Sequence, residues 1–116
     1  MLYIPRTQHE RALLALAVVI DETYPPQMAS ATTYALLRQH YTDLPVEIIN
    51  PMFMVDVALD EIVFARVTLH QALRTVNARV GNRVGLTPDG RLIIRQATLD
   101  DAIRAVPIHN RLKAQE

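Results

Sequence analysis

The chain has 116 residues, half of them apolar, and no cysteine, which excludes a disordered chain, disulfides, thiolate metal sites and thiol nucleophiles. Its formal net charge is zero, but residues 1–65 carry three basic and eight acidic residues, whereas residues 66–116 carry nine basic residues, eight of them arginine, and four acidic ones. This asymmetry predicts an acidic partner for the second part of the chain, nucleic acid first, or docking of one part on the other.

A chain of this length is expected to form one domain over residues 1–116 with one hydrophobic core. The longest apolar run covers residues 12–20, far fewer than the roughly 20 residues that cross a bilayer. Acidic residues interrupt the approach to this run and follow its end, which is not the pattern of a signal peptide. We therefore expect a cytoplasmic protein without a membrane segment.

The first predicted element is a helix over residues 8–23. Thr7 and Glu10 have the spacing of a capping box, which favours a helix start at this point. Pro25 and Pro26 end the helix, because proline excludes the residue before it from helical angles.

A second helix is predicted over residues 30–41, with Ser30 or Thr32 as its cap. The short apolar run at residues 46–49 follows a turn, and its type stays open.

The clearest periodicity in the chain predicts a helix over residues 51–80. Its core positions recur at spacings of four and three, the repeat of one helix face. They are Val55, Leu59, Ile62, Arg66, Leu69, Leu73, Val76 and Val80, and all but Arg66 are apolar. This helix is expected to be bent or interrupted near residues 66–68. In a competing interpretation, residues 62–67 form a β-strand and Thr68 caps a new helix.

Residues 83–96 are predicted to form a β-hairpin. Pro88, Asp89 and Gly90 supply its turn, because proline fixes φ and glycine adopts a positive φ. A last short helix is expected over residues 98–106, followed by a frayed tail over residues 108–116.

Together these elements predict a mostly α (α+β) fold, a small helical domain with one β-hairpin late in the chain, similar to a winged helix. The alternative is an α+β fold with a three-stranded antiparallel sheet that includes residues 61–67.

Candidate nucleic-acid-binding residues lie on the helix before the hairpin and on the hairpin itself. When the apolar positions of the helix face inward, a turn of 100° per residue places the polar ones outward. The outward set is His70, Gln71, Arg74 and Asn77, whose side-chain types hydrogen-bond base edges. The hairpin adds Arg83, Arg91 and Arg95 for phosphate contacts, in the order of recognition helix and wing that winged-helix proteins have. Double-stranded DNA is the expected partner, and its symmetric recognition predicts a homodimer.

No catalytic site, cofactor or metal is expected. The three glycines all lie within residues 81–90, so the chain has no glycine-rich phosphate loop, and its histidines have no recognisable catalytic or ligand spacing. Asp56 and Asp60 share one face of the predicted helix over residues 51–80, and Arg66 interrupts its apolar face. These three charged residues are a candidate interface, in which a charge pair would fix the register of two chains.

Two functions follow from these features. The first is a small, non-enzymatic DNA-binding regulatory protein. The alternative is a non-enzymatic interaction or accessory protein, of the general size of phage and immunity proteins, whose acidic and basic halves mediate association with a second copy or with another protein.

Overall fold

The fold is α+β, and strands hold as many of the described residues as helices do. The computed structural model describes residues 7–49 and 56–96. The elements in chain order are α1 (Gln8–Leu16), β1 (Val19–Tyr24), β2 (Gln27–Met28), α2 (Ala29–His40), β3 (Val46–Ile49), β4 (Ala58–Leu59), β5 (Ile62–Thr68), α3 (Leu69–Ala78), β6 (Asn82–Leu86) and β7 (Leu92–Gln96). The prediction of a mostly α fold is therefore wrong. The predicted similarity to a winged helix is also wrong, because the helix before the hairpin follows a strand rather than a second helix.

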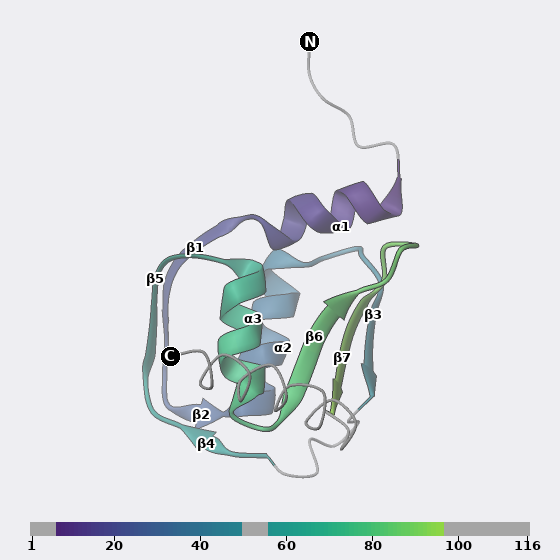
Figure 1. Ribbon diagram of the computed structural model, residues 1–116. Helices are drawn as coiled ribbons and strands as arrows, with labels where there is room; N and C mark the ends of the chain where they lie inside the picture. The colour runs from purple at the N-terminus through teal and green to yellow at the C-terminus, as the bar shows by residue number, and fades with distance from the viewer. Residues whose placement is uncertain (1–6, 50–55, 97–116) are drawn as a thin grey trace, which may run out of the picture.

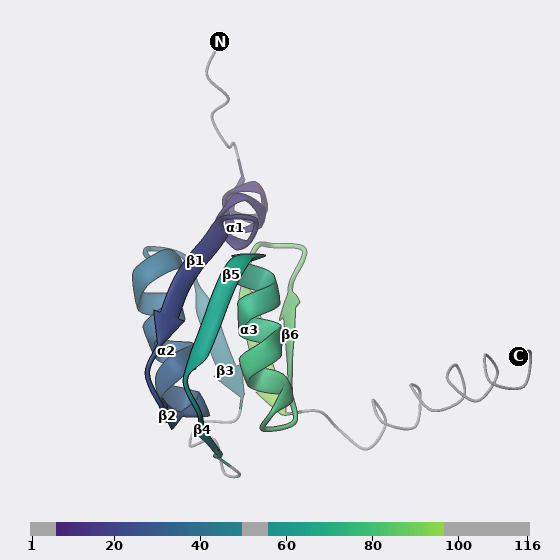
Figure 2. The same ribbon diagram turned by 90° about the vertical axis from the view of Figure 1, so that its left-hand side faces the viewer.

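Helices α2 and α3 form a central layer between two sets of strands (Figure 1). On one side, β1 and β5 pair antiparallel, and we call this pair the β1–β5 ribbon. On the other side, three strands form a mixed sheet in the order β3-β7-β6, with β3 parallel and β6 antiparallel to β7. Helix α1 crosses one end of the molecule. Figure 2 looks onto the ribbon and shows α2 and α3 behind it.

The hydrophobic core lies between these layers. The ribbon contributes Ile20 and Phe64, α2 contributes Leu36, α3 contributes Leu73, and the sheet contributes Ile94, all of them buried. Each such side chain stabilises the fold by about 1.5–3 kcal/mol through removal of its apolar surface from water.

The first helix is shorter than predicted, because α1 covers only the first part of residues 8–23 and β1 takes the rest. Its start is as predicted, since Thr7 Oγ1 accepts a hydrogen bond from the Glu10 amide at 3.1 Å. Along β1, exposed and buried side chains alternate from Val19 and Ile20 onward, which is the period of a strand. Their β-branched side chains favour that conformation.

The long helix predicted over residues 51–80 is also wrong. Residues 50–55 lie outside the described ranges, and the remainder forms β4, β5 and α3. The competing interpretation describes this part of the chain, because Thr68 ends β5 and caps α3 in a capping box with Gln71. At Arg66 the backbone has a φ of 56°, a left-handed conformation that is incompatible with a continuous helix.

The second predicted helix is present as α2, but its predicted cap is wrong: Met28 holds the N-cap position without a side-chain cap bond, and Ser30 and Thr32 lie inside the helix. The hairpin predicted over residues 83–96 is confirmed by the β6–β7 pair. The undecided run at residues 46–49 is strand β3. The alternative three-stranded sheet is wrong in its membership, because residues 61–67 pair with β1 and the third strand beside the hairpin is β3.

The predicted helix over residues 98–106 and the tail over residues 108–116 lie outside the described residues. Among the helices that are described, none combines the length and the apolar character needed to span a bilayer.

Candidate nucleic-acid interface

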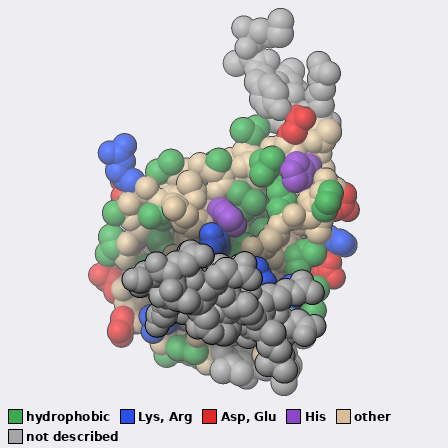
Figure 3. Space-filling view, in the orientation of Figure 1, with side chains coloured by type: hydrophobic (Ala, Val, Ile, Leu, Met, Phe, Trp, Pro, Cys, Tyr) green, Lys and Arg blue, Asp and Glu red, His purple; other side chains and the backbone are tan. Residues whose placement is uncertain are grey.

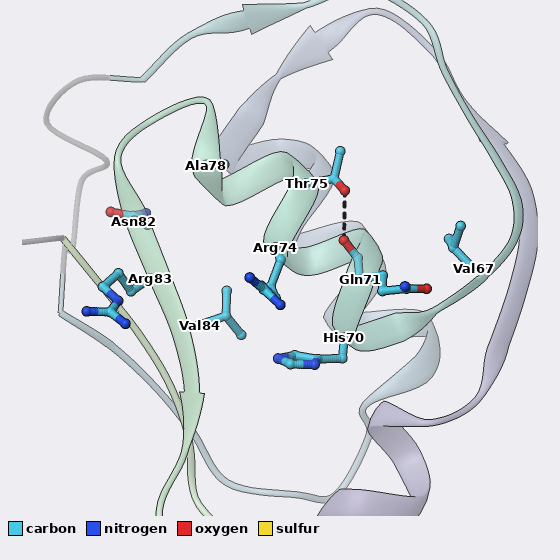
Figure 4. Close-up of a pocket in the computed structure, with 9 residues that line it drawn as sticks. All are labelled: Val67, His70, Gln71, Arg74, Thr75, Ala78, Asn82, Arg83 and Val84. Atoms are coloured by element: carbon cyan, nitrogen blue, oxygen red, sulfur yellow. Dashed lines mark hydrogen bonds between the residues drawn. The ribbon is translucent and has the colours of Figure 1, made fainter. Parts of the chain in front are cut away.

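A groove runs between the outer side of α3 and β6, and we call it the α3–β6 groove (Figure 4). It has a volume of about 650 Å³ and is lined by Val67, His70, Gln71, Arg74, Thr75, Ala78, Asn82, Arg83 and Val84. His70 and Arg74 extend from α3 toward β6, where Val84 lies opposite them (Figure 4). Four of the predicted residues, His70, Gln71, Arg74 and Arg83, therefore line one groove.

The capping box of α3 sets which side chains face this groove. Thr68 Oγ1 accepts from the Gln71 amide, and Gln71 Oε1 accepts from the Thr68 amide, both at 3.1 Å. These two bonds satisfy amides of the first turn and fix where the helix starts. Because Leu69 and Leu73 are then fully buried, the helical repeat leaves Gln71 and Arg74 exposed.

Asn77, which was predicted to read base edges, lies in the core instead. Its exposed fraction is zero. Its Nδ2 donates to Thr33 Oγ1 at 3.2 Å and to the Leu73 carbonyl at 2.8 Å, and its Oδ1 accepts from Asn82 Nδ2 at 3.2 Å. A side chain with these partners holds elements together and is not available at the surface.

Arg83 and Arg95 stand directly opposite each other in the β6–β7 pair. Both line a second groove, of about 460 Å³, that extends along the hairpin to Ile49 of β3. Because Arg83 also lines the α3–β6 groove, it connects the two grooves.

Two like charges directly opposite each other destabilise a sheet and raise the local positive potential. We call Arg74, Arg83 and Arg95 the basic surface. Figure 3 shows basic side chains and a histidine over α3 and β6 on this side of the molecule.

Arg91 does not belong to the basic surface. It precedes β7 at the turn of the hairpin, and its Nη1 lies 3.2 Å from Glu47 Oε2 of β3. Both side chains are about half exposed, so the ion pair contributes little to stability. Of the three predicted hairpin arginines, Arg83 and Arg95 are brought together and Arg91 is held apart.

His70 differs from the arginines of this groove because its surroundings favour the uncharged form of its side chain. Burial lowers the pKa of its imidazole, and the nearby charge of Arg74 lowers that pKa further. Both effects favour the neutral imidazole, in which one ring nitrogen donates a hydrogen bond and the other accepts one.

The three residues of the predicted interface do not lie on a common helix. The Asp56 carboxylate accepts hydrogen bonds from the Ser30 amide and hydroxyl and from the Val57 amide, which satisfies the start of α2. Asp60 is exposed between β4 and β5, and Arg66 is exposed within β5. Asp56 is therefore a helix cap, whereas the other two charges remain on the surface.

Some residues of the α3–β6 groove were not predicted. Thr75 could have been found from the sequence, because it follows Gln71 by four residues on the same side of the helix. Val67, Asn82 and Val84 come from strands, and no local pattern says that these strands lie beside α3. Within residues 7–49 and 56–96, no group of three or more histidine and acidic residues is arranged to hold a metal.

Comparisons with known proteins assign neither a family nor a function to the chain. No protein-family model matches the sequence, and no curated protein matches it.

Proposed function

We propose that this protein is a non-enzymatic DNA-binding protein that contacts the phosphates of duplex DNA through its basic surface. The observation that carries the proposal is the position of Arg83, which lines the groove of Arg74 on one side and the groove of Arg95 on the other. Arg74 of α3 and Arg95 of β7 therefore line two grooves that meet at Arg83 of β6. Arginine binds phosphate oxygens in bidentate geometry, which makes such a surface suitable for a polyanion.

In this proposal the neighbouring polar groups orient the DNA. Gln71 is exposed, and the neutral form of His70 is favoured, so both contribute hydrogen bonds without a net charge. Phosphate contacts dominate the affinity, and we expect weak discrimination between sequences.

The salt dependence of binding tests the proposal. Fluorescence anisotropy with a labelled duplex of mixed sequence should give a slope of log affinity against log salt near −2.7, which is about −0.9 for each of three phosphates. Arg74→Gln should reduce the size of that slope by about 0.9 and weaken binding of all sequences alike.

Arg11→Gln is the matched control. Arg11 is exposed on α1 and outside both grooves, and its replacement removes the same charge from the protein. The proposal fails if the duplex does not bind at about 50 mM salt, where phosphate contacts are strongest, or if Arg11→Gln changes the slope as much as Arg74→Gln.

A second candidate function, binding of an extended protein segment, is favoured by the position of β6 at the edge of its sheet. The Thr87 amide donates to the Arg91 carbonyl at 2.9 Å. Because hydrogen-bonded and non-bonded pairs alternate in an antiparallel ladder, the backbone groups of Val84 and Leu86 point away from β7. An extended segment with acidic side chains could add to this edge and meet Arg74.

Hydrogen exchange separates the two functions. A hexapeptide of alternating Glu and Val should protect the Val84 and Leu86 amides from exchange if it adds as a strand. Duplex DNA held by side chains should leave the protection of these amides unchanged while it shifts the guanidinium resonances of the basic surface. Protection by the peptide without any binding of DNA would favour the second function over the first.

A further inference from the structure

Arg66 occupies a backbone conformation that costs free energy. It is the extra residue of a β-bulge, because Val67 pairs with Ile20 and Ala65 pairs with Asp21, which leaves Arg66 without a partner position in β1. Its φ is 56°. Glycine usually fills such a position, since a side chain in the left-handed region is disfavoured by about 1–2 kcal/mol. A bulky residue in the left-handed region is a backbone outlier, and such outliers cluster at functional sites.

The outer face of the β1–β5 ribbon carries two large apolar side chains that are exposed to water, Val19 and Val63. The inward positions, such as Ile20 and Phe64, are buried. Of the outward positions of β1, Asp21 and Thr23 are polar and exposed, whereas Val19 is 60% exposed and Val63 of β5 is 63% exposed. A strand pair with one solvated face ordinarily carries polar side chains on that face. A second layer over the ribbon would bury the two exposed valines.

Two opposite charges lie between these valines. Asp21 pairs with Ala65, the residue before Arg66, so Asp21 and Arg66 are close neighbours on the two strands. Both are exposed, and no ion pair joins them within the described part of the chain. The ribbon face thus carries one positive and one negative charge, and a second copy of the chain would present the same two charges.

We propose that the outer face of the β1–β5 ribbon is the interface between two copies of this chain. In this dimer a two-fold axis runs between the two ribbon faces, parallel to the strands. It places β1 of one copy over β5 of the other. Asp21 of each copy then faces Arg66 of the other, and Val19 and Val63 flank the two charge pairs. An interface that meets its own copy in this way is isologous and closes as a dimer.

The interface goes beyond the proposed DNA binding and does not depend on it. Helix α3 lies between the ribbon and β6, so a dimer formed through the ribbon leaves both α3–β6 grooves open (Figure 2). The ribbon is about 20 Å long at 3.3 Å per residue, which is small for a stable interface. We therefore expect a weak dimer with a Kd in the micromolar range.

Reciprocal charge reversal tests the proposal with sedimentation analysis of the full chain. Asp21→Arg alone and Arg66→Asp alone should each weaken self-association about tenfold or more, because each variant places like charges opposite each other. An equimolar mixture of the two variants should form a heterodimer with roughly wild-type affinity, since both charge pairs are restored only between unlike copies. Both substitutions are at exposed positions, and circular dichroism of each variant verifies the fold.

Arg66→Gly gives a second measurement with a matched control. Glycine should retain the bulge and weaken the dimer, whereas Asp43→Gly, at another left-handed position outside the ribbon, should leave association unchanged. A wild-type chain that remains monomeric at about 0.5 mM overturns the proposal, because a micromolar Kd would make it mostly dimeric. Unaltered association of both charge variants, or a mixture that forms no heterodimer, overturns it as well.

Discussion

Asn82 Nδ2 donates a hydrogen bond to Asn77 Oδ1 at 3.2 Å, and both side chains are buried. The bond joins the last turn of α3 to the first residue of β6, across the turn that contains Gly81. Asn77 also donates to Thr33 of α2 at 3.2 Å. One buried amide therefore fixes the angle between α3, β6 and α2, and with it the shape of the α3–β6 groove.

We expect Asn77→Ala to lower the free energy of unfolding by about 2–4 kcal/mol, because it leaves buried polar groups without a partner. Urea denaturation measures this change. Thr75→Ala on the exposed side of the same helix is the control and should stay within about 0.5 kcal/mol. A change as small for Asn77→Ala as for Thr75→Ala would mean that water or neighbouring groups replace the lost bonds.

The three glycines predict a graded series of stabilities. At Gly90, φ is 90° and an added Cβ would lie 2.4 Å from the His9 backbone nitrogen. At Gly81, φ is 73° and an added Cβ meets nothing within 4 Å. Gly85 has neither restriction.

Gly90→Ala should therefore be the most destabilising, by about 2–5 kcal/mol, since it combines left-handed strain with a collision against backbone. Gly81→Ala should cost about 1–2 kcal/mol from strain alone, and Gly85→Ala should change stability by less than about 1 kcal/mol. Thermal denaturation of the three variants measures the order. An equal effect at Gly90 and Gly81 would show that α1 is not packed against the hairpin turn as described.

The elements that could be predicted from the sequence are those with local signals. Pro88 and Gly90 specify the hairpin turn within a few residues, and Thr7 fixes the start of α1 through the amide of Glu10. Such signals act within one turn of chain, so they do not depend on what the segment packs against.

The ribbon could not be predicted in the same way because its pairing is not local. Val19 pairs with Thr68 across 48 residues of intervening chain, and Tyr24 pairs with Ile62 across 37. Each strand taken alone also fits a helical repeat, and only the pairing decides between the two. The left-handed backbone at Arg66 is the local sign of that choice, and nothing in the identity of an arginine indicates it.

The candidate site was predicted in part for a similar reason. The phase of α3 correctly placed Gln71 and Arg74 outside. It failed at Asn77 because α3 packs against α2, the ribbon and β6 at once, which buries a wider arc than one apolar stripe. The prediction placed Asn77 on the exposed side of the helix with Gln71 and Arg74. The sequence alone does not distinguish an exposed asparagine from a buried one whose hydrogen bonds are satisfied.

The final prediction concerns acid stability and the Glu22 carboxylate of β1. Glu22 Oε1 lies 2.7 Å from His40 Nε2 of α2, and Glu22 Oε2 accepts from the Tyr24 hydroxyl at 2.7 Å. Burial acts to raise the pKa of this carboxyl, but the hydrogen bonds from His40 and Tyr24 and the charge of His40 together hold it below its ordinary value. The folded protein therefore favours the ionised form more than the unfolded chain does.

A carboxyl whose folded pKa is depressed contributes stability at pH values above its unfolded pKa, near 4.3, and that stability is lost as pH falls through the folded pKa. Glu22→Gln should thus be less stable than the wild type at pH 7, and the two free energies of unfolding should converge as pH falls below about 4. Tyr24→Phe, which removes one of the hydrogen bonds, should raise the Glu22 pKa in a carbon-detected titration and move the acid loss to higher pH. A gap between wild type and Glu22→Gln that stays constant from about pH 7 to pH 3 would contradict this linkage, because a constant gap requires equal proton binding in the two states.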